Sequence, residues 1–301
     1  MGGFDDCVLK GSVFWRFAGV LLFALSGLGT GAGSAAEPGV GAGARGGSAA
    51  QQAFKEGESI ARFPKLPEQA APEEVKARVH CTEEPAALDP EGDTFVVHVP
   101  KGYRGTEPWG LVVWVSPSDS GRPPQEWLRV LEERRLLWVG AQKAGNPRNI
   151  FARMQLALCA NAGMRERFRI DGRRVYVSGF SGGGRVASIL GVAWADMFSG
   201  SVPMMGVNFF TDLPAADGKR VYAPQYIPDD MVLGIARERT RHVLVTSEKD
   251  FNLADTRIVF EKGYQQEGFR RVDLLEVPGI GHALPGGEWF AKALDLLERA
   301  R

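Results

Sequence analysis

The pattern of apolar and polar positions from about residue 94 onward switches repeatedly between the period of a strand and that of a helix. Apolar residues at i, i+3 and i+4 spacing predict helices at 124–134, 151–168, 187–198, 253–269 and 290–297. Short alternating or continuous apolar runs predict strands at 94–99, 111–116, 136–141, 175–178, 243–246 and 272–277. Strands that alternate with helices favour a mostly parallel central sheet with helices on both faces. The predicted fold class is therefore α/β.

The first 36 residues follow a different pattern. Lys10 and Arg16 precede the apolar run 17–28, and small residues follow, ending in Ser34-Ala35-Ala36. This layout is typical of a secretory signal peptide, so we expect cleavage near Ala36 and a secreted or periplasmic protein. The apolar run is shorter than the roughly 20 residues that span a bilayer, so no stable membrane anchor is expected after cleavage.

Two further stretches lack regular periodicity. Residues 37–71 are rich in Gly, Ala, Ser and Pro, which predicts a flexible linker. The folded domain is then expected to span residues 72–301. Within it, residues 207–240 contain several prolines and aromatics without a clear strand. Such a stretch predicts either a cap insertion over the functional site or an ordinary surface excursion.

Composition narrows the function classes. The 36 basic and 36 acidic residues cancel, so there is no electrostatic reason to expect nucleic acid as a partner. No pair of cysteines at zinc spacing, no H-E-x-x-H and no phosphate-binding loop motif occurs, so no metal and no cofactor are expected. After removal of residues 1–36, Cys81 and Cys159 remain. They could pair in an oxidising compartment or stay two separate buried thiols.

One short motif carries candidate chemistry. Gly179-Phe180-Ser181-Gly182-Gly183 fits G-x-S-x-G and stands between a predicted strand and a predicted helix. In that setting a sharp turn exposes the Ser181 hydroxyl as a nucleophile. The N–H of Gly182, at the start of the helix, would be the first donor to an oxyanion. The alternative is a glycine-rich turn that binds phosphate or merely turns.

A serine nucleophile needs a base and an acid that orients the base. Of the four histidines, only His282 stands in a loop directly after a predicted strand and before the last helix. Asp250, in the loop after the strand at 243–246, is the favoured acid, with Asp255 and Glu248 as rivals. The order Ser181, Asp250, His282 is that of α/β-hydrolases.

The segment RIDGRRVYVSGFSGGGRVASILGVAWADMFSGSVPMMG resembles the nucleophile region of the polyhydroxybutyrate-depolymerase-like and feruloyl-esterase-like α/β-hydrolases. The phrases FVVHVPKGY and VPGIGHALP resemble that family's opening strand and catalytic histidine loop. The resemblance covers roughly residues 92–300. It implies an α/β-hydrolase fold and esterase activity on a small-molecule or polymeric ester, with Ser181, Asp250 and His282 as the triad.

The loop after the strand LVVWV departs from the family pattern. Where such enzymes carry His-Gly, this chain has Ser116-Pro117-Ser118. Pro117 has no N–H to donate, so Ser118 is the expected second oxyanion donor.

These features predict an exported serine hydrolase that cleaves carboxylic esters through an acyl-enzyme on Ser181. A peptidase or amidase with the same triad is one alternative. A non-catalytic binding protein of the α/β-hydrolase fold is another, which the altered loop leaves open.

Overall fold

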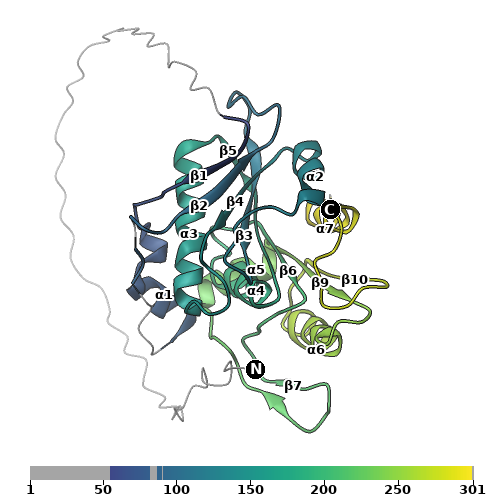
Figure 1. Cartoon of the computed structure of the whole chain (residues 1–301). Helices are drawn as coiled ribbons and strands as arrows, with labels where there is room; N and C mark the ends of the chain where they lie inside the picture. Colours follow the sequence, from purple (N-terminus) through teal and green to yellow (C-terminus); the bar gives the residue numbers. More distant parts are fainter. Residues whose placement is uncertain (1–54, 82–86, 90, 300–301) are drawn as a thin grey trace, which may run out of the picture. The chain divides into compact units, whose positions relative to one another are not determined.

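An eight-stranded sheet lies at the centre of the fold (Figure 1). The computed structural model describes residues 55–81, 87–89 and 91–299. The strand order is β1-β2-β4-β3-β5-β6-β9-β10, with β2 antiparallel to both of its neighbours and all other pairs parallel. These strands are β1 (Gly57–Ala61), β2 (Phe95–Val99), β3 (Trp109–Val115), β4 (Leu136–Ala141), β5 (Ile170–Phe180), β6 (Gly200–Met204), β9 (Arg241–Ser247) and β10 (Val272–Val277).

Helices connect most of the strands. A short hairpin of β7 (Leu213–Pro214) and β8 (Val221–Tyr222) stands apart from the main sheet. The α-helices are α1 (Pro72–Val79), α2 (Leu128–Glu133), α3 (Ile150–Arg167), α4 (Gly182–Ala193), α5 (Asp230–Glu238), α6 (Leu253–Ile258) and α7 (Gly287–Glu298). Two short 3₁₀ helices, η1 (Glu68–Ala70) and η2 (Gln125–Trp127), and a π-helical segment, η3 (Val259–Gln265), complete the elements.

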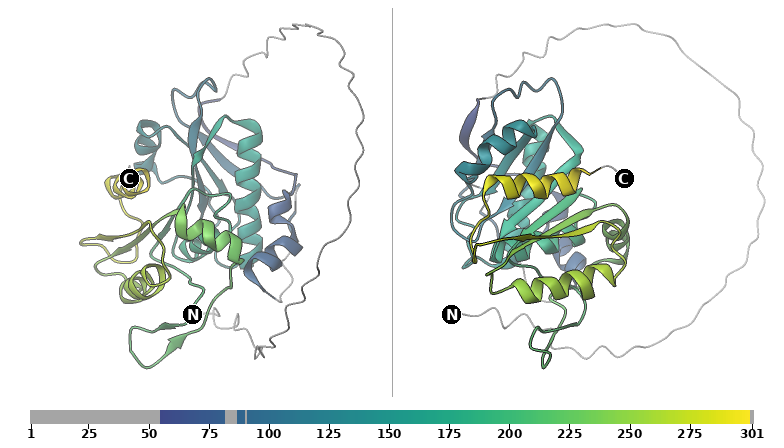
Figure 2. Two further views of the ribbon diagram at one scale, coloured as in Figure 1. Left: turned by 180° about the vertical axis from the view of Figure 1, so that it is seen from behind. Right: turned by 90° about the vertical axis from the view of Figure 1, so that its right-hand side faces the viewer.

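Both faces of the sheet are covered. Along β3, Leu111 and Val113 belong to one apolar cluster with residues of α3, α4 and α5, whereas Val112 and Trp114 belong to a second cluster with residues of α2 and α7. Successive side chains of a strand point to opposite faces, which explains this division. Figure 2 shows α3 and α7 on opposite sides of the sheet. The predicted α/β class, with helices on both faces, is confirmed.

The sheet begins earlier in the chain than the apolar pattern predicts. Strand β1 lies inside the predicted linker 37–71 and pairs antiparallel with β2. Two residues later, Phe63 is buried, and its ring lies 4.9 Å from that of Phe95. An edge strand is held mainly by backbone hydrogen bonds, so GESIA needs no strong apolar pattern. The predicted signal peptide, residues 1–36, and linker residues 37–54 lie outside the described residues.

The predicted cap region, 207–240, divides into two parts. Its second part contains α5, which Asp229 caps by accepting hydrogen bonds from the N–H groups of Met231 and Val232. Val232 and Leu233 are buried in the core, so this helix is a regular layer element. The first part is irregular apart from the β7–β8 hairpin. Only that part can be called an insertion.

The structure also describes the two cysteines that follow residue 36. Cys159 is a buried thiol in α3 and is not joined to Cys81 in a disulfide, and burial raises the pKa of Cys159 to about 12. Within the described ranges, none of the helices combines the length and apolar character that crossing a bilayer requires.

Candidate active site

The candidate nucleophile stands on a strained turn between β5 and α4. Ser181 has φ 54° and ψ −119°, a conformation that residues with a β-carbon rarely adopt. Its N–H donates to the Met204 carbonyl at 2.8 Å. A β-carbon on Gly183 would lie 1.9 Å from the Val115 carbonyl oxygen, and one on Gly179 would lie 2.3 Å from that of Gly183. Both glycines are therefore required for this turn to pass the end of β3.

The histidine follows β10 in a loop that reaches the turn. The Nε2 atom of His282 lies 2.9 Å from Oγ of Ser181, and its Nδ1 atom lies 2.8 Å from Oδ1 of Asp250. The imidazole contacts two aromatic rings, with centroid distances of 5.0 Å to Phe180 and 4.2 Å to Phe251. The structure thus brings the three predicted residues into one hydrogen-bonded chain.

The carboxylate of Asp250 is fixed by its own loop. The side chain is fully buried and accepts hydrogen bonds from the Thr246 hydroxyl at 3.1 Å and the Asn252 N–H at 3.2 Å. The Asn252 side chain donates in turn to the Met205 carbonyl at 2.9 Å, which ties the acid loop to the end of β6. Asn252 therefore positions the acid loop, and no sequence motif identifies this residue.

The two rival acids are occupied elsewhere. Asp255 lies in α6 and accepts hydrogen bonds from the Ala216 N–H and the Tyr222 hydroxyl, both at 3.3 Å. It therefore fastens the β7–β8 hairpin. Glu248 accepts the N–H of Gly279 at 2.8 Å. Of the three carboxylates considered, Asp250 is the one that contacts His282.

Of the two expected oxyanion donors, Gly182 has an available N–H and Ser118 does not. Gly182 is the first residue of α4, so its N–H has no acceptor within the helix and is available to a ligand. The expectation for Ser118 is corrected by the structure. Its N–H donates to Oγ of Ser116 at 3.1 Å, so the amide is engaged inside its own turn. Serine hydroxyls commonly accept such local backbone hydrogen bonds, and the sequence offered two serines at that spacing.

A buried arginine, which the sequence analysis missed, supports this edge of the site. Arg153 in α3 is 2% exposed and donates to the carbonyls of Ala144 at 2.9 Å and Ser116 at 2.8 Å. Burial lowers the pKa of this guanidinium to about 10. It joins the loop after β3 to the loop after β4. A charged residue inside a predicted amphipathic helix is the only signal that could have drawn attention to it.

Solved structures share this architecture. A ferulic acid esterase matches with a TM-score of 0.50 and 16% identity over 67% of this chain and 88% of its own. A protein from Bacteroides ovatus described as a dipeptidyl aminopeptidase IV matches with a TM-score of 0.50 and 12% identity over 70% and 34%. The chain has the α/β-hydrolase fold.

Other comparisons set the limits of this likeness. A thermostable esterase aligns with a TM-score of 0.49 and 16% identity over 69% of this chain and 60% of its own. The chain spans less than two thirds of the length of that esterase and of the Bacteroides ovatus protein. No protein-family model and no curated protein matches the sequence.

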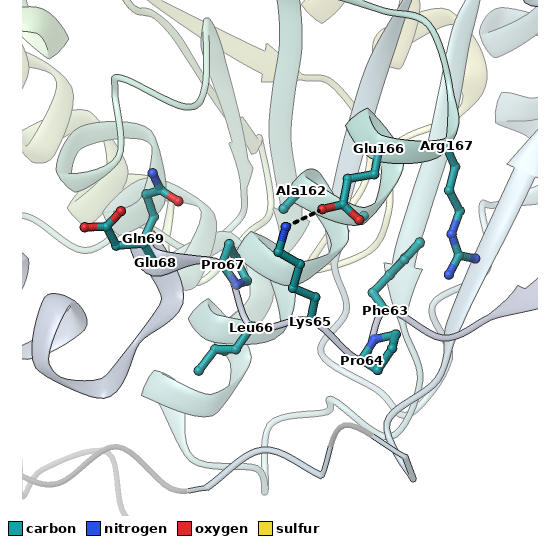
Figure 3. A pocket seen from close by; sticks show the side chains of 11 residues that line it. Phe63, Pro64, Lys65, Leu66, Pro67, Glu68, Gln69, Ala162, Glu166 and Arg167 are labelled. Atoms are coloured by element: carbon teal, nitrogen blue, oxygen red, sulfur yellow. Dashed lines mark hydrogen bonds and ion pairs between the residues drawn. The ribbon is translucent and has the colours of Figure 1, made fainter.

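In this α/β-hydrolase fold the three residues follow β5, β9 and β10, at the carboxyl edge of the parallel strands where such folds bind ligands. A cavity of about 490 Å³ lies elsewhere, at the far end of α3 (Figure 3). Lys65 and Glu166 form an ion pair at 3.0 Å across it. Among the described residues, no cluster of His, Cys, Asp and Glu could hold a metal ion.

Proposed function

We propose that this protein is a serine hydrolase that cleaves carboxylic esters through an acyl-enzyme on Ser181. The observation that carries the proposal is the hydrogen-bonded chain from Ser181 through His282 to Asp250, at 2.9 and 2.8 Å. It begins on a strained turn at a helix N-terminus, where a developing oxyanion is stabilised.

Each residue then has one role in the reaction. Ser181 Oγ attacks the ester carbonyl while His282 Nε2 accepts its proton, and His282 returns that proton to the departing alcohol. Water deprotonated by the same nitrogen then releases the acid and restores the hydroxyl. Asp250 stays ionised, fixes the imidazole tautomer through Nδ1 and stabilises the imidazolium. The Gly182 N–H donates to the oxyanion in both steps.

Esters are the proposed substrates because of the resemblance of residues 169–206 to esterase nucleophile regions. The ferulic acid esterase among the similar structures agrees with this choice. We further propose that residues 1–36 direct export, so that the enzyme works outside the cytoplasm on a small-molecule or polymeric ester. Comparing the N-terminal residue of the protein recovered from outside the cell with position 37 tests the export step.

The activity is tested with the full chain and two probes. A fluorophosphonate should label the wild type and not Ser181→Ala, and p-nitrophenyl butyrate should be hydrolysed by the wild type alone. A matching p-nitroanilide should be cleaved at least 100-fold more slowly. Labelling without ester hydrolysis, or faster cleavage of the anilide, would contradict an esterase. Absence of labelling would contradict any serine hydrolase.

A further inference from the structure

Three positions in the loop after β3 supply no main-chain donor to the oxyanion. Two donors about 3 Å from the oxyanion are usual in acyl transfer, and Gly182 supplies one. In the loop after β3, Pro117 has no N–H and the Ser118 amide is engaged by Ser116. The Gly121 N–H donates to Oε1 of Gln142 at 2.6 Å. Three positions of this loop therefore offer nothing to the substrate.

The neighbouring loop, between β4 and α3, places a side-chain amide beside the nucleophile turn. A β-carbon on Gly182 would lie 2.1 Å from Oδ1 of Asn146, 2.8 Å from its Cγ and 3.1 Å from its Nδ2. The carboxamide thus packs directly against the residue that follows Ser181. Asn146 is an exposed residue, so it is not enclosed in the core. A terminal amide can present either its oxygen or its two N–H donors by rotating about its last bond.

The structure holds this loop close to the site. The Asn146 N–H donates to the Pro117 carbonyl at 2.9 Å, and the Gly145 N–H donates to Oδ1 of Asp119 at 3.3 Å. The buried guanidinium of Arg153 fixes the same two loops by donating hydrogen bonds to the carbonyls of Ala144 and Ser116. A β-carbon on Gly145 would lie 2.9 Å from that Asp119 oxygen, so a glycine is needed for the approach. Several contacts therefore hold the backbone of Asn146 in place.

We propose that the Asn146 side chain is the second oxyanion donor, a role that Pro117 and the engaged Ser118 amide do not fill. This inference rests on the proposed function, because it assigns a further catalytic residue to the same reaction. Nδ2–H of Asn146 and N–H of Gly182 donate to the carbonyl oxygen as it becomes an oxyanion. The hydrogen bonds strengthen in the transition state, so their loss lowers kcat and changes KM little.

Two substitutions separate donation from packing. Asn146→Ala should lower kcat for p-nitrophenyl butyrate by about 10²–10³ with KM within about threefold, as is usual when one oxyanion donor is lost. Asn146→Asp keeps the shape of the side chain but cannot donate when ionised, so kcat should fall at least as far at pH 7. Lys143→Ala, an exposed position in the same loop, is the matched control and should stay within about twofold of the wild type.

The outcomes distinguish this inference from the proposed function. An active wild type whose activity survives in Asn146→Ala overturns the inference alone and leaves a main-chain amide as the second donor. Activity retained in Asn146→Asp but lost in Asn146→Ala also overturns it, because packing then suffices. An inactive wild type that fluorophosphonate does not label overturns both. A loss in both variants, with unchanged thermal unfolding and full activity in Lys143→Ala, supports the inference.

Discussion

Among the residues that the structure describes, two Ser–His pairs have the same hydrogen-bond length. Nε2 of His282 lies 2.9 Å from Oγ of Ser181, and Nδ1 of His242 lies 2.9 Å from Oγ of Ser201. The hydrogen-bond length therefore does not distinguish the two pairs. What separates them is the surroundings: a carboxylate, access to solvent and the conformation of the serine.

The second pair belongs to the core. His242 is 0% exposed and packs against the rings of Tyr264 and Phe269, and burial lowers the pKa of its imidazole to about 3. Ser201 lies within strand β6, in regular backbone. A base so buried stays neutral and reaches no substrate. His282 instead has a side chain that is 21% exposed and contacts the buried carboxylate of Asp250.

The comparison shows which parts of a triad carry the chemistry. A serine hydroxyl beside an imidazole can be an ordinary buried hydrogen bond that satisfies two polar groups. The catalytic version adds an acid that fixes the tautomer and a turn that exposes the hydroxyl at a helix start. Substitutions that remove these parts one at a time should therefore abolish the activity that distinguishes the Ser181–His282 pair from the buried pair.

The largest effect is expected at the serines. Ser181→Ala should lower kcat for p-nitrophenyl butyrate by on the order of 10⁴–10⁶, because the nucleophile is gone while the fold is intact. Ser201→Ala should leave kcat of the folded protein within about twofold. It should lower the free energy of unfolding by about 1–3 kcal/mol, because a buried imidazole loses its partner. Steady-state kinetics and urea unfolding measure both. A Ser181→Ala variant that keeps a tenth of the activity would end the assignment.

The next largest effect tests the acid. Asp250→Asn should lower kcat by about 10⁴, because the amide favours the wrong imidazole tautomer. The contacts from Thr246 and Asn252 can persist, so the melting temperature should change little. Kinetics at pH 7 together with thermal unfolding check this. A loss below tenfold would mean that the Ser181–His282 pair works without its carboxylate.

Most of the core and the three proposed triad residues could be predicted from the sequence, for a physical reason. Buried strands of a parallel sheet are continuous apolar runs, and Ser181, Asp250 and His282 each follow one of them. Strand β6, GSVPM, was missed because Gly200, Ser201 and Pro203 interrupt the apolar run. Tertiary contacts make it a strand: it pairs with β5 and β9, and its side chains are buried.

The second oxyanion donor could not be predicted. Whether the Ser118 amide points into the site depends on a local competition with the Ser116 hydroxyl, and sequence spacing does not decide that competition. Asn146 reaches Gly182 from another loop, 36 residues before it in the chain. Contacts between loops at one sheet edge follow from the strand order β4-β3-β5, which the helical and strand periods do not fix.

A smaller effect concerns stability at acid pH. The pKa of His242 is about 3 in the fold and about 6.5 when unfolded, so the unfolded chain binds a proton first as the pH falls. The contribution to stability is full above pH 6.5 and is lost by about 1.4 kcal/mol per pH unit between pH 6.5 and 3. The free energy of unfolding, measured in urea at pH 7, 6 and 5, should therefore fall less steeply with decreasing pH for His242→Gln than for the wild type. Parallel curves would contradict a neutral buried His242.

The smallest effect is expected at the rival acid, Asp255. Asp255→Asn should change kcat by less than about threefold, because this side chain contacts the β7–β8 hairpin and not His282. The amide oxygen can still accept the Ala216 N–H, and the amide nitrogen can donate to the Tyr222 hydroxyl, so unfolding should shift by at most about 1 kcal/mol. Both Asp255→Asn and Asp250→Asn remove one negative charge, but only Asp250 contacts His282. Measuring the two variants under the same conditions therefore separates the effect of that contact from the effect of charge near the site. A loss at Asp255 that equals the loss at Asp250 would show that local charge, not the contact with His282, distinguishes the two Ser–His pairs.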